Sequence, residues 1–191
     1  MSKKLKDFSR LEIYDFVIEY ALSPLCTSLE ECAKSYGISQ YMAKKLVYKA
    51  ISDCIVDDNV VDILADKAQR SASKHAYDEG ICQAPFSTYQ KYQSLKEERK
   101  NFTIPQEDGI KLVIEYAASP LSKETFCEKN AISKALFDRT FVQVISKCLV
   151  ADDIVKSLYR KAFEASRNPD KVNKLFEKLW KARKQFQKSH L

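Results

Sequence analysis

An internal repeat constrains the fold of this chain more than any other feature of its sequence. Residues 17–25 read VIEYALSPL and residues 113–121 read VIEYAASPL, which differ at one position. After a deletion of two residues the similarity continues, and residues 50–68 correspond to residues 144–162. Because self-similarity at a fixed spacing is the signature of repeated structural units, we expect two copies of one domain.

The first helix of each copy is predicted to begin at a capping box. Ser9 is followed three residues later by Glu12, and Thr103 is followed three residues later by Gln106. In this pattern the hydroxyl group and the Glu or Gln side chain satisfy free amides at a helix start. The helix is then expected to end near the Ser-Pro pair of each copy, since the residue before proline disfavours the α conformation.

The periodicity elsewhere is helical and predicts an all-α fold. Apolar residues recur at helix spacing in the fourth segment of each copy, and no segment alternates as a strand does. A polar amphipathic helix is expected at the end of each copy, at about residues 86–100 and 170–187, and residues 71–85 are expected to form an irregular connection. The predicted domains are a first repeat at residues 1–94 and a second repeat at residues 95–191, which includes a basic C-terminal helix.

Composition excludes several classes of function. Only three glycines occur in 191 residues, and neither glycine-rich phosphate-binding pattern is present. No apolar run approaches the length that spans a bilayer, and the basic N-terminus is followed by polar residues instead of an apolar signal core. We therefore expect a cytoplasmic protein that makes no membrane contact through a spanning segment and that associates with the nucleoid if it binds DNA.

The cysteines and histidines do not predict a metal site or a catalytic centre. Six cysteines lack any C-x-x-C spacing, and His75 and His190 are the only histidines. We expect reduced cysteines that act as small buried hydrophobic residues, with no metal and no cofactor. No local group of Cys, His and carboxylates predicts catalysis, so an enzyme is not expected. The acidic pairs at residues 57–58 and 152–153 are expected at the start of a helix, where the helix dipole favours them.

The functional prediction depends on residues 28–51, which read SLEECAKSYGISQYMAKKLVYKAI. Ala33 provides a small side chain where two helices can cross closely. Gly37 lies four residues later, where a left-handed turn favours glycine, and Ser39 can cap the next helix. The segment resembles the helix-turn-helix of prokaryotic and phage DNA-binding proteins. The positions that such motifs keep apolar or small are occupied by Leu29, Cys32, Tyr36, Ile38, Ala43 and Leu46.

This resemblance implies that the second helix of the motif is a recognition helix, whose early residues enter the major groove. Glutamine can bond an adenine edge, lysine can bond guanine or phosphate, and the tyrosine hydroxyl groups can bond phosphate oxygens. A solvated helix face is the alternative for the lysines, and partial core packing is the alternative for the tyrosines. The candidate DNA-binding residues are Ser39, Gln40, Tyr41, Lys44, Lys45 and Tyr48.

The second copy departs from this pattern. Ala131 stands where Gly37 stands in the first copy, and a left-handed alanine costs about 1 kcal/mol. Asp138 replaces Lys44 and places a negative charge on the face that would approach phosphate. We expect this copy to read a different sequence, to bind weakly, or to mediate self-association or contact with a protein partner. Its candidate DNA contacts are Ser133, Lys134 and Arg139.

Positive charge is concentrated at the C-terminal end. Residues 156–191 contain eleven Lys or Arg and three acidic residues, a net charge of +8 in a chain whose total is +6. Asn168 and Pro169 form a helix start, and the lysines of the following helix lie largely off its apolar stripe. Phosphate contact, membrane-surface binding and a solvated face all remain open. The candidate contacts are Lys178, Lys181 and Lys184.

The sequence thus predicts a protein that binds double-stranded DNA, as a transcriptional regulator or as a phage or mobile-element factor. Fold-level analogy supplies part of this prediction. The alternative is a helical protein-interaction module, such as a polymerase-binding adaptor or a relative of small terminase subunits. The acidic residues beside the predicted reading face favour this alternative, namely Asp57, Asp58, Asp62 and Asp66.

Overall fold

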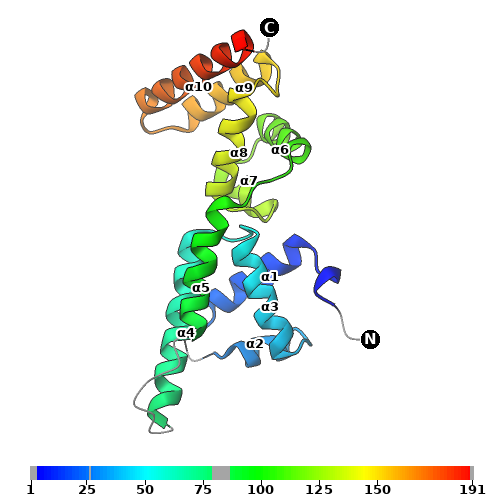
Figure 1. Ribbon diagram of the computed structural model, residues 1–191, viewed down its shortest axis with the longest axis vertical. Helices are drawn as coiled ribbons and strands as arrows, with labels where there is room; N and C mark the ends of the chain where they lie inside the picture. The colour runs from blue at the N-terminus through cyan, green and yellow to red at the C-terminus, as the bar shows by residue number, and fades with distance from the viewer. Residues whose placement is uncertain (1–3, 26, 79–86, 190–191) are drawn as a thin grey trace. The chain divides into compact units, whose positions relative to one another are not determined.

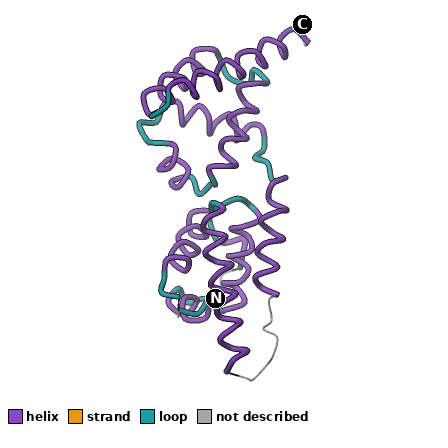
Figure 2. Tube along the Cα trace, turned by 90° about the vertical axis from the view of Figure 1, so that its left-hand side faces the viewer, coloured by secondary structure: helices purple, strands orange, loops and turns teal. Residues whose placement is uncertain are grey.

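The computed structural model describes residues 4–25, 27–78 and 87–189, and all regular structure in these ranges is helical. Figure 1 labels the α-helices in chain order, and Figure 2 shows helices joined by loops with no strand in the described residues. The expected all-α fold is therefore confirmed.

Two compact units make up the chain, Met1–Phe102 with Lys129–Ser133 and Thr103–Glu128 with Lys134–Leu191. The helices of the N-terminal part are η1 (Leu5–Asp7), α1 (Arg10–Leu22), α2 (Leu29–Ser35), α3 (Gln40–Ser52), α4 (Asp58–Asp78), α5 (Ser87–Glu98) and η2 (Arg99–Asn101). Those that follow are α6 (Gln106–Ala118), α7 (Lys123–Lys129), α8 (Lys134–Ser146), α9 (Asp152–Ala165) and α10 (Pro169–Ser189).

Helix α1 begins at the predicted capping box. The hydroxyl oxygen of Ser9 accepts from the amide of Glu12 at 3.2 Å, and the Ser9 amide donates to the Glu12 carboxylate at 2.8 Å. The matching prediction at Thr103 is wrong, because α6 begins at Gln106 and its N-cap residue is Pro105, which makes no side-chain cap bond. At the offset of 96 residues between the two VIEYA segments, Pro105 is the residue that corresponds to Ser9.

The irregular connection predicted for residues 71–85 is wrong in its first part, because α4 continues to Asp78. No glycine or proline occurs from Asp58 to Asp78, so nothing in this stretch breaks a helix. Residues 79–86 lie outside the described residues. The two predicted final helices are present as α5 and α10, and Asn168 caps α10 by accepting from the amide of Lys171 at 3.2 Å.

The acidic residues predicted at helix starts lie there. Asp58 is in the first turn of α4, and Asp152 and Asp153 are in the first turn of α9. Each unit also has its own apolar core. In the first unit the fully buried side chains include Ile13, Phe16, Leu46, Ile51 and Leu64, and in the second they include Val113, Ile145, Val155 and Leu158.

A lysine that is buried in the first unit and half-buried in the second holds the first helix of each unit at matched positions. The Nζ atom of Lys67 donates to the carbonyl oxygen of Tyr20 at 2.6 Å and to the hydroxyl of Ser23 at 2.7 Å. In the second unit, Lys161 donates to the carbonyl oxygen of Tyr116 at 2.7 Å. Burial lowers the pKa of Lys161 from its ordinary value. Each lysine thereby ties the fourth helix of its unit to the C-terminal end of the first.

A buried arginine recurs in the same way. Arg99 donates to a backbone carbonyl oxygen at 2.9 Å and pairs with Asp58 on α4. Arg183 donates to a backbone carbonyl oxygen at 2.6 Å and pairs with Asp152 on α9 through its Nε atom at 2.9 Å. Both guanidinium groups are 4 to 5 % exposed. The final helical segment of each unit is therefore anchored by one arginine.

Helices α3 and α8 end in the same unusual turn. Cys54 and Cys148 have φ values of +52° and +56°, a left-handed conformation in which glycine is the usual residue. The thiol of Cys54 donates to the carbonyl oxygen of Arg99 at 3.5 Å, and the thiol of Cys148 donates to that of Arg183 at 3.4 Å. The cysteine side chain thus joins each helix end to the anchored final segment.

Candidate functional site

Helix α3 is held by buried small and apolar side chains on one face. Ala33 of α2 is 1 % exposed, and Ala43 and Leu46 of α3 are fully buried. These positions are the ones at which the helix-turn-helix pattern predicts packing between the two helices. The packing fixes which face of α3 remains outside.

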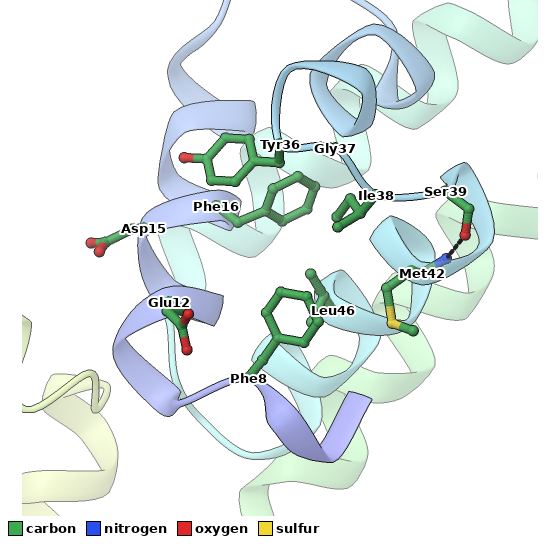
Figure 3. Close-up of a pocket in the computed structure, with 10 residues that line it drawn as sticks. All are labelled: Phe8, Glu12, Asp15, Phe16, Tyr36, Gly37, Ile38, Ser39, Met42 and Leu46. Carbon is green, nitrogen blue, oxygen red and sulfur yellow. Dashed lines mark hydrogen bonds between the residues drawn. The ribbon is translucent and has the colours of Figure 1, made fainter. Parts of the chain in front are cut away.

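The turn between α2 and α3 has the geometry that the sequence predicts. Gly37 has a φ of +63°, its amide donates to the carbonyl oxygen of Lys34 at 3.0 Å, and the amide of Ile38 donates to that of Ala33 at 3.0 Å. These two bonds form a Schellman motif. Ser39 then caps α3 by accepting from the amide of Met42 at 3.2 Å, as Figure 3 shows.

Tyr36, at one of the positions that the motif keeps apolar or small, is only partly packed. Its ring packs edge-on against Phe16, with the ring centroids 5.1 Å apart, but 40 % of the residue is exposed. Its hydroxyl donates to the carboxylate of Glu19, which is the main reason that the pKa of Tyr36 is raised to about 12. The sequence pattern marks an apolar position here and gives no sign of this polar contact with α1.

The N-terminal half of α3 presents polar side chains to solvent. Ser39, Gln40 and Lys44 are exposed, and Tyr41 is 66 % exposed. Lys45 is half-buried, with its Nζ atom 4.4 Å from the centroid of the Tyr41 ring. The structure therefore brings together five of the six candidate residues of the first copy on the first half of one helix.

Tyr48 is the exception among these candidates. It is half-buried and packs against the first core, with its ring centroid 5.9 Å from that of Tyr92 on α5. The expectation that Tyr48 faces outward is wrong, and the alternative of partial core packing holds. The reason is that α5 packs against α3 and places Tyr92 beside Tyr48, a contact between segments distant in sequence.

A half-open cavity of about 530 Å³ lies beside this turn, between α1 and the start of α3. Figure 3 shows that its apolar lining comes from Phe8, Phe16 and Leu46, while the carboxylates of Glu12 and Asp15 lie along α1. Carboxylates at this rim repel phosphate. A polyanion that contacts this unit is therefore expected to approach the outer face of α3 and to leave the α1 side free.

Helices α7 and α8 of the second copy retain the left-handed turn, but α8 exposes fewer of the predicted DNA-contact residues. Ala131 has a φ of +48°, so the left-handed conformation is retained without glycine. Ser133 is only 1 % exposed, and the expectation that it faces outward is wrong, because its amide donates to the carbonyl oxygen of Cys54 at 2.8 Å. Lys134 is half-buried and Arg139 is exposed.

The negative charge expected on α8 is partly compensated. Lys123, at the start of α7, donates to the two carboxylate oxygens of Asp138 at 3.1 and 3.2 Å. This ion pair joins residues fifteen positions apart, and no local sequence pattern marks it. Val142 on the same helix is 43 % exposed. The outer face of α8 therefore carries an acidic residue, Asp138, at the position of Lys44 on α3.

Helix α10 exposes its lysines and buries the centre of its apolar stripe, while Leu175 of the same stripe is 44 % exposed. Phe176 and Leu179 are 2 % and 4 % exposed, which confirms the core-facing side predicted for this helix. Sequence reasoning missed Arg183, which interrupts that stripe as a buried anchor. The exposed lysines of α10 are Lys171, Lys174, Lys178, Lys181, Lys184 and Lys188.

Among the described residues, no group of three or more His, Cys, Asp or Glu side chains is placed to hold a metal ion. The described cysteines Cys32, Cys54, Cys127 and Cys148 are free thiols. Neither histidine side chain is among the described ones. Within the same residues, no helix is both long and apolar enough to cross a membrane.

Comparison with protein-family models, with curated proteins and with solved structures finds no match. No relative therefore assigns a function, and the exposed faces of α3 and α10 are the features that bear on one.

Proposed function

We propose that this chain binds double-stranded DNA through the N-terminal half of α3, with α2 and α3 acting as a helix-turn-helix. One observation carries the proposal. Gln40, Tyr41 and Lys44 are exposed on the first half of a helix whose opposite face is buried, and that helix follows a Schellman turn at Gly37. Recognition helices of this class present their N-terminal residues to base edges in the major groove.

The chemistry of these side chains suits base and phosphate contact. Gln40 can form two hydrogen bonds with one adenine, to its N6 and N7 atoms, and Lys44 can form a hydrogen bond with guanine. The Tyr41 hydroxyl can donate to a phosphate oxygen. Lys45, stacked on the Tyr41 ring, supports that ring and adds positive charge close to it.

We further propose that the chain carries two helix-turn-helix copies of unequal roles, the second built on α7 and α8. The retained left-handed turn at Ala131 supports this assignment. The ion pair of Asp138 and the burial of Ser133 leave α8 with a weaker reading face. Sequence discrimination is accordingly assigned to α3.

Selection of bound sequences from a random pool of duplex DNA tests the proposal. We expect one enriched motif, for which Gln40→Ala and Lys44→Gln each weaken binding by about 1 to 3 kcal/mol. Lys111→Gln on α6 is the control, since Lys111 is exposed and its loss changes the net charge equally. If no motif is enriched, or if both variants bind as the control does, α3 is not a reading helix.

Retention on duplex DNA and on heparin, measured over a series of salt concentrations, tests the competing function. A chain that is retained on neither duplex DNA nor heparin, at any salt concentration, has no polyanion surface. That result would favour the helical protein-interaction module over DNA binding.

A further inference from the structure

Helices α5 and α10 occupy the same place in their units, so each serves as a control for the other. At an offset of 84 residues, Tyr92 corresponds to Phe176, Leu95 to Leu179 and Arg99 to Arg183. All six residues are buried, with exposed fractions between 2 % and 7 %. Both arginines pair with the aspartate in the first turn of the preceding long helix. The inward faces of α5 and α10 are therefore built alike.

The outward faces differ in charge. At the same offset, the positions of Lys171, Lys174, Lys178 and Lys181 on α10 carry polar or acidic residues on α5, and all eight positions are exposed. The corresponding residues on α5 are Ser87, Gln90, Ser94 and Glu97.

The difference extends to the neighbouring helices. Asp62 and Asp66 on α4 correspond to Lys156 and Arg160 on α9, at the 94-residue offset. In the first unit Asp62 pairs with Lys96 of α5 at 2.5 Å. In the second unit both members of this pair are replaced, by Lys156 and by the half-buried Trp180. Exposed acidic positions of the first unit have thus become basic in the second.

The lysines of α10 are not required to fold the unit. The first unit anchors an equivalent helix through the same buried residues and carries no lysine at these four positions. Lysines three or four residues apart on a helix repel one another. Asp170 and Glu177 lie four residues before Lys174 and Lys181 and offset part of this repulsion. The surplus of positive charge that remains can be neutralised by an anion outside the helix.

We infer that the outer face of α10 is a second DNA-contact surface, which binds the phosphate backbone of duplex DNA without reading its sequence. The inference rests on the proposed function for its class of ligand. From Lys171 to Lys188 the helix rises about 26 Å, so one face can follow several successive phosphates. Its contribution is an affinity that falls with salt, whereas α3 contributes sequence preference.

The packing of α10 argues against a membrane surface as the ligand. A helix that lies in the lipid interface inserts an apolar face opposite its basic one. The apolar centre of α10 is already used, because Phe176 and Leu179 are buried in the second core. The outside of α10 carries mainly charged side chains, with Leu175 as an isolated apolar side chain at 44 % exposure, and such a surface suits a hydrated phosphate backbone better than a lipid interface.

The test uses the full chain and a random-sequence DNA duplex. In the test variant, Lys171→Ser, Lys174→Gln, Lys178→Ser and Lys181→Gln give α10 neutral polar residues of the kind that α5 carries. In the control variant, Lys91→Gln, Lys100→Gln, Lys111→Gln and Lys129→Gln remove the same charge from four exposed lysines elsewhere. Thermal melting by circular dichroism compares the folding of both variants.

We measure the binding constant for the duplex over a series of salt concentrations. In the test variant the magnitude of the slope of log K against log salt is expected to fall by about 3 to 4, because each lost phosphate contact removes about 0.9. The control variant is expected to keep most of the original slope. Equal slopes in the two variants would overturn the inference, as would loss of binding to anionic vesicles in the test variant while DNA binding is kept.

The outcome for α10 can be distinguished from the outcome for α3. A chain with no preferred sequence still reports whether α10 binds a random duplex. Conversely, the sequence preference could disappear in Lys44→Gln while the salt slope of the α10 variant stays unchanged. That result would support α3 as the reading helix and overturn the inference that α10 contacts phosphates.

Discussion

The Nζ atom of Lys67 lies 4.7 Å from the centroid of the Tyr20 ring and also donates to the carbonyl oxygen of Tyr20 at 2.6 Å. Lys67 is 3 % exposed, so its charge is stabilised by these contacts and the Ser23 hydroxyl instead of by water.

Replacing Lys67 with Met is therefore expected to lower the free energy of unfolding by about 1 to 3 kcal/mol, because polar acceptors at the end of α1 lose a charged donor. Urea denaturation followed by circular dichroism measures this change. The control is Lys91→Met on the exposed face of α5, which should change stability by less than about 0.5 kcal/mol. Equal stability of the two variants would show that the buried ammonium contributes nothing.

The turn at Gly37 offers a prediction about backbone conformation alone. A Cβ atom added there meets no atom within 4 Å, so Gly37→Ala is expected to cost about 1 to 2 kcal/mol through its left-handed φ. Gly37→Asn should cost less, because asparagine tolerates this conformation better. Denaturant unfolding of the two variants measures their free energies of unfolding. An alanine variant as stable as the wild type would contradict the predicted cost of the left-handed φ.

The reverse change in the second copy is expected to behave differently. Ala131 is left-handed but only 1 % exposed. Ala131→Gly relieves about 1 kcal/mol of backbone strain and loses about 0.8 kcal/mol from burial of one methyl group. The free energy of unfolding should change by less than about 0.5 kcal/mol. A large gain in stability would mean that the methyl group contributes little to packing.

The two partners of the Arg183–Asp152 pair are expected to contribute unequally. The arginine side chain is 5 % exposed and the aspartate is 58 % exposed. Arg183→Met leaves buried carbonyl oxygens without a donor and should cost about 2 to 4 kcal/mol. Asp152→Asn should cost less than about 1 kcal/mol, because the arginine keeps its carbonyl partners. Equal costs, measured in urea, would place the energy in the ion pair itself.

Tyr36 predicts a pH dependence. Its pKa is raised to about 12 by the bond to Glu19, from an ordinary value of 10. Because the pKa of Tyr36 is raised in the folded state, the bond between Tyr36 and Glu19 contributes its full stabilisation of the fold below pH 10. This stabilisation is lost as the pH rises through 12. Ultraviolet titration, taken as the difference between the wild type and Tyr36→Phe, should show this tyrosine ionising near pH 12. Glu19→Gln should shift the ionisation toward pH 10, and an unchanged difference spectrum would exclude the carboxylate as the cause.

Local signals made much of the fold predictable from the sequence. Ser9, Ser39 and Asn168 cap helices as expected because a cap depends on residues within one turn. The left-handed turn at Gly37 follows from the same kind of short-range rule. At Thr103 a local pattern failed, because Pro105, two residues later, became the cap instead.

Contacts between distant segments could not be predicted from the sequence. The burial of Ser133, the packing of Tyr48 against Tyr92 and the pairing of Lys123 with Asp138 each depend on which helices lie together. Arg183 was counted only as part of the positive charge of residues 156–191, although it is a buried anchor. For the site, local pattern sufficed to mark the exposed start of α3 and could not show how far along the helix that exposure extends.

The left-handed cysteines at the ends of α3 and α8 have a consequence for how each unit opens. The thiol of Cys54 is bonded to the carbonyl oxygen of Arg99, and the guanidinium of Arg99 is bonded to the start of α4. Three segments that are separate in the chain thus share one junction, and the second unit repeats it at Cys148. Detachment of a final helix from its unit must break that junction. The segments that it joins are therefore expected to exchange their amide protons together within each unit.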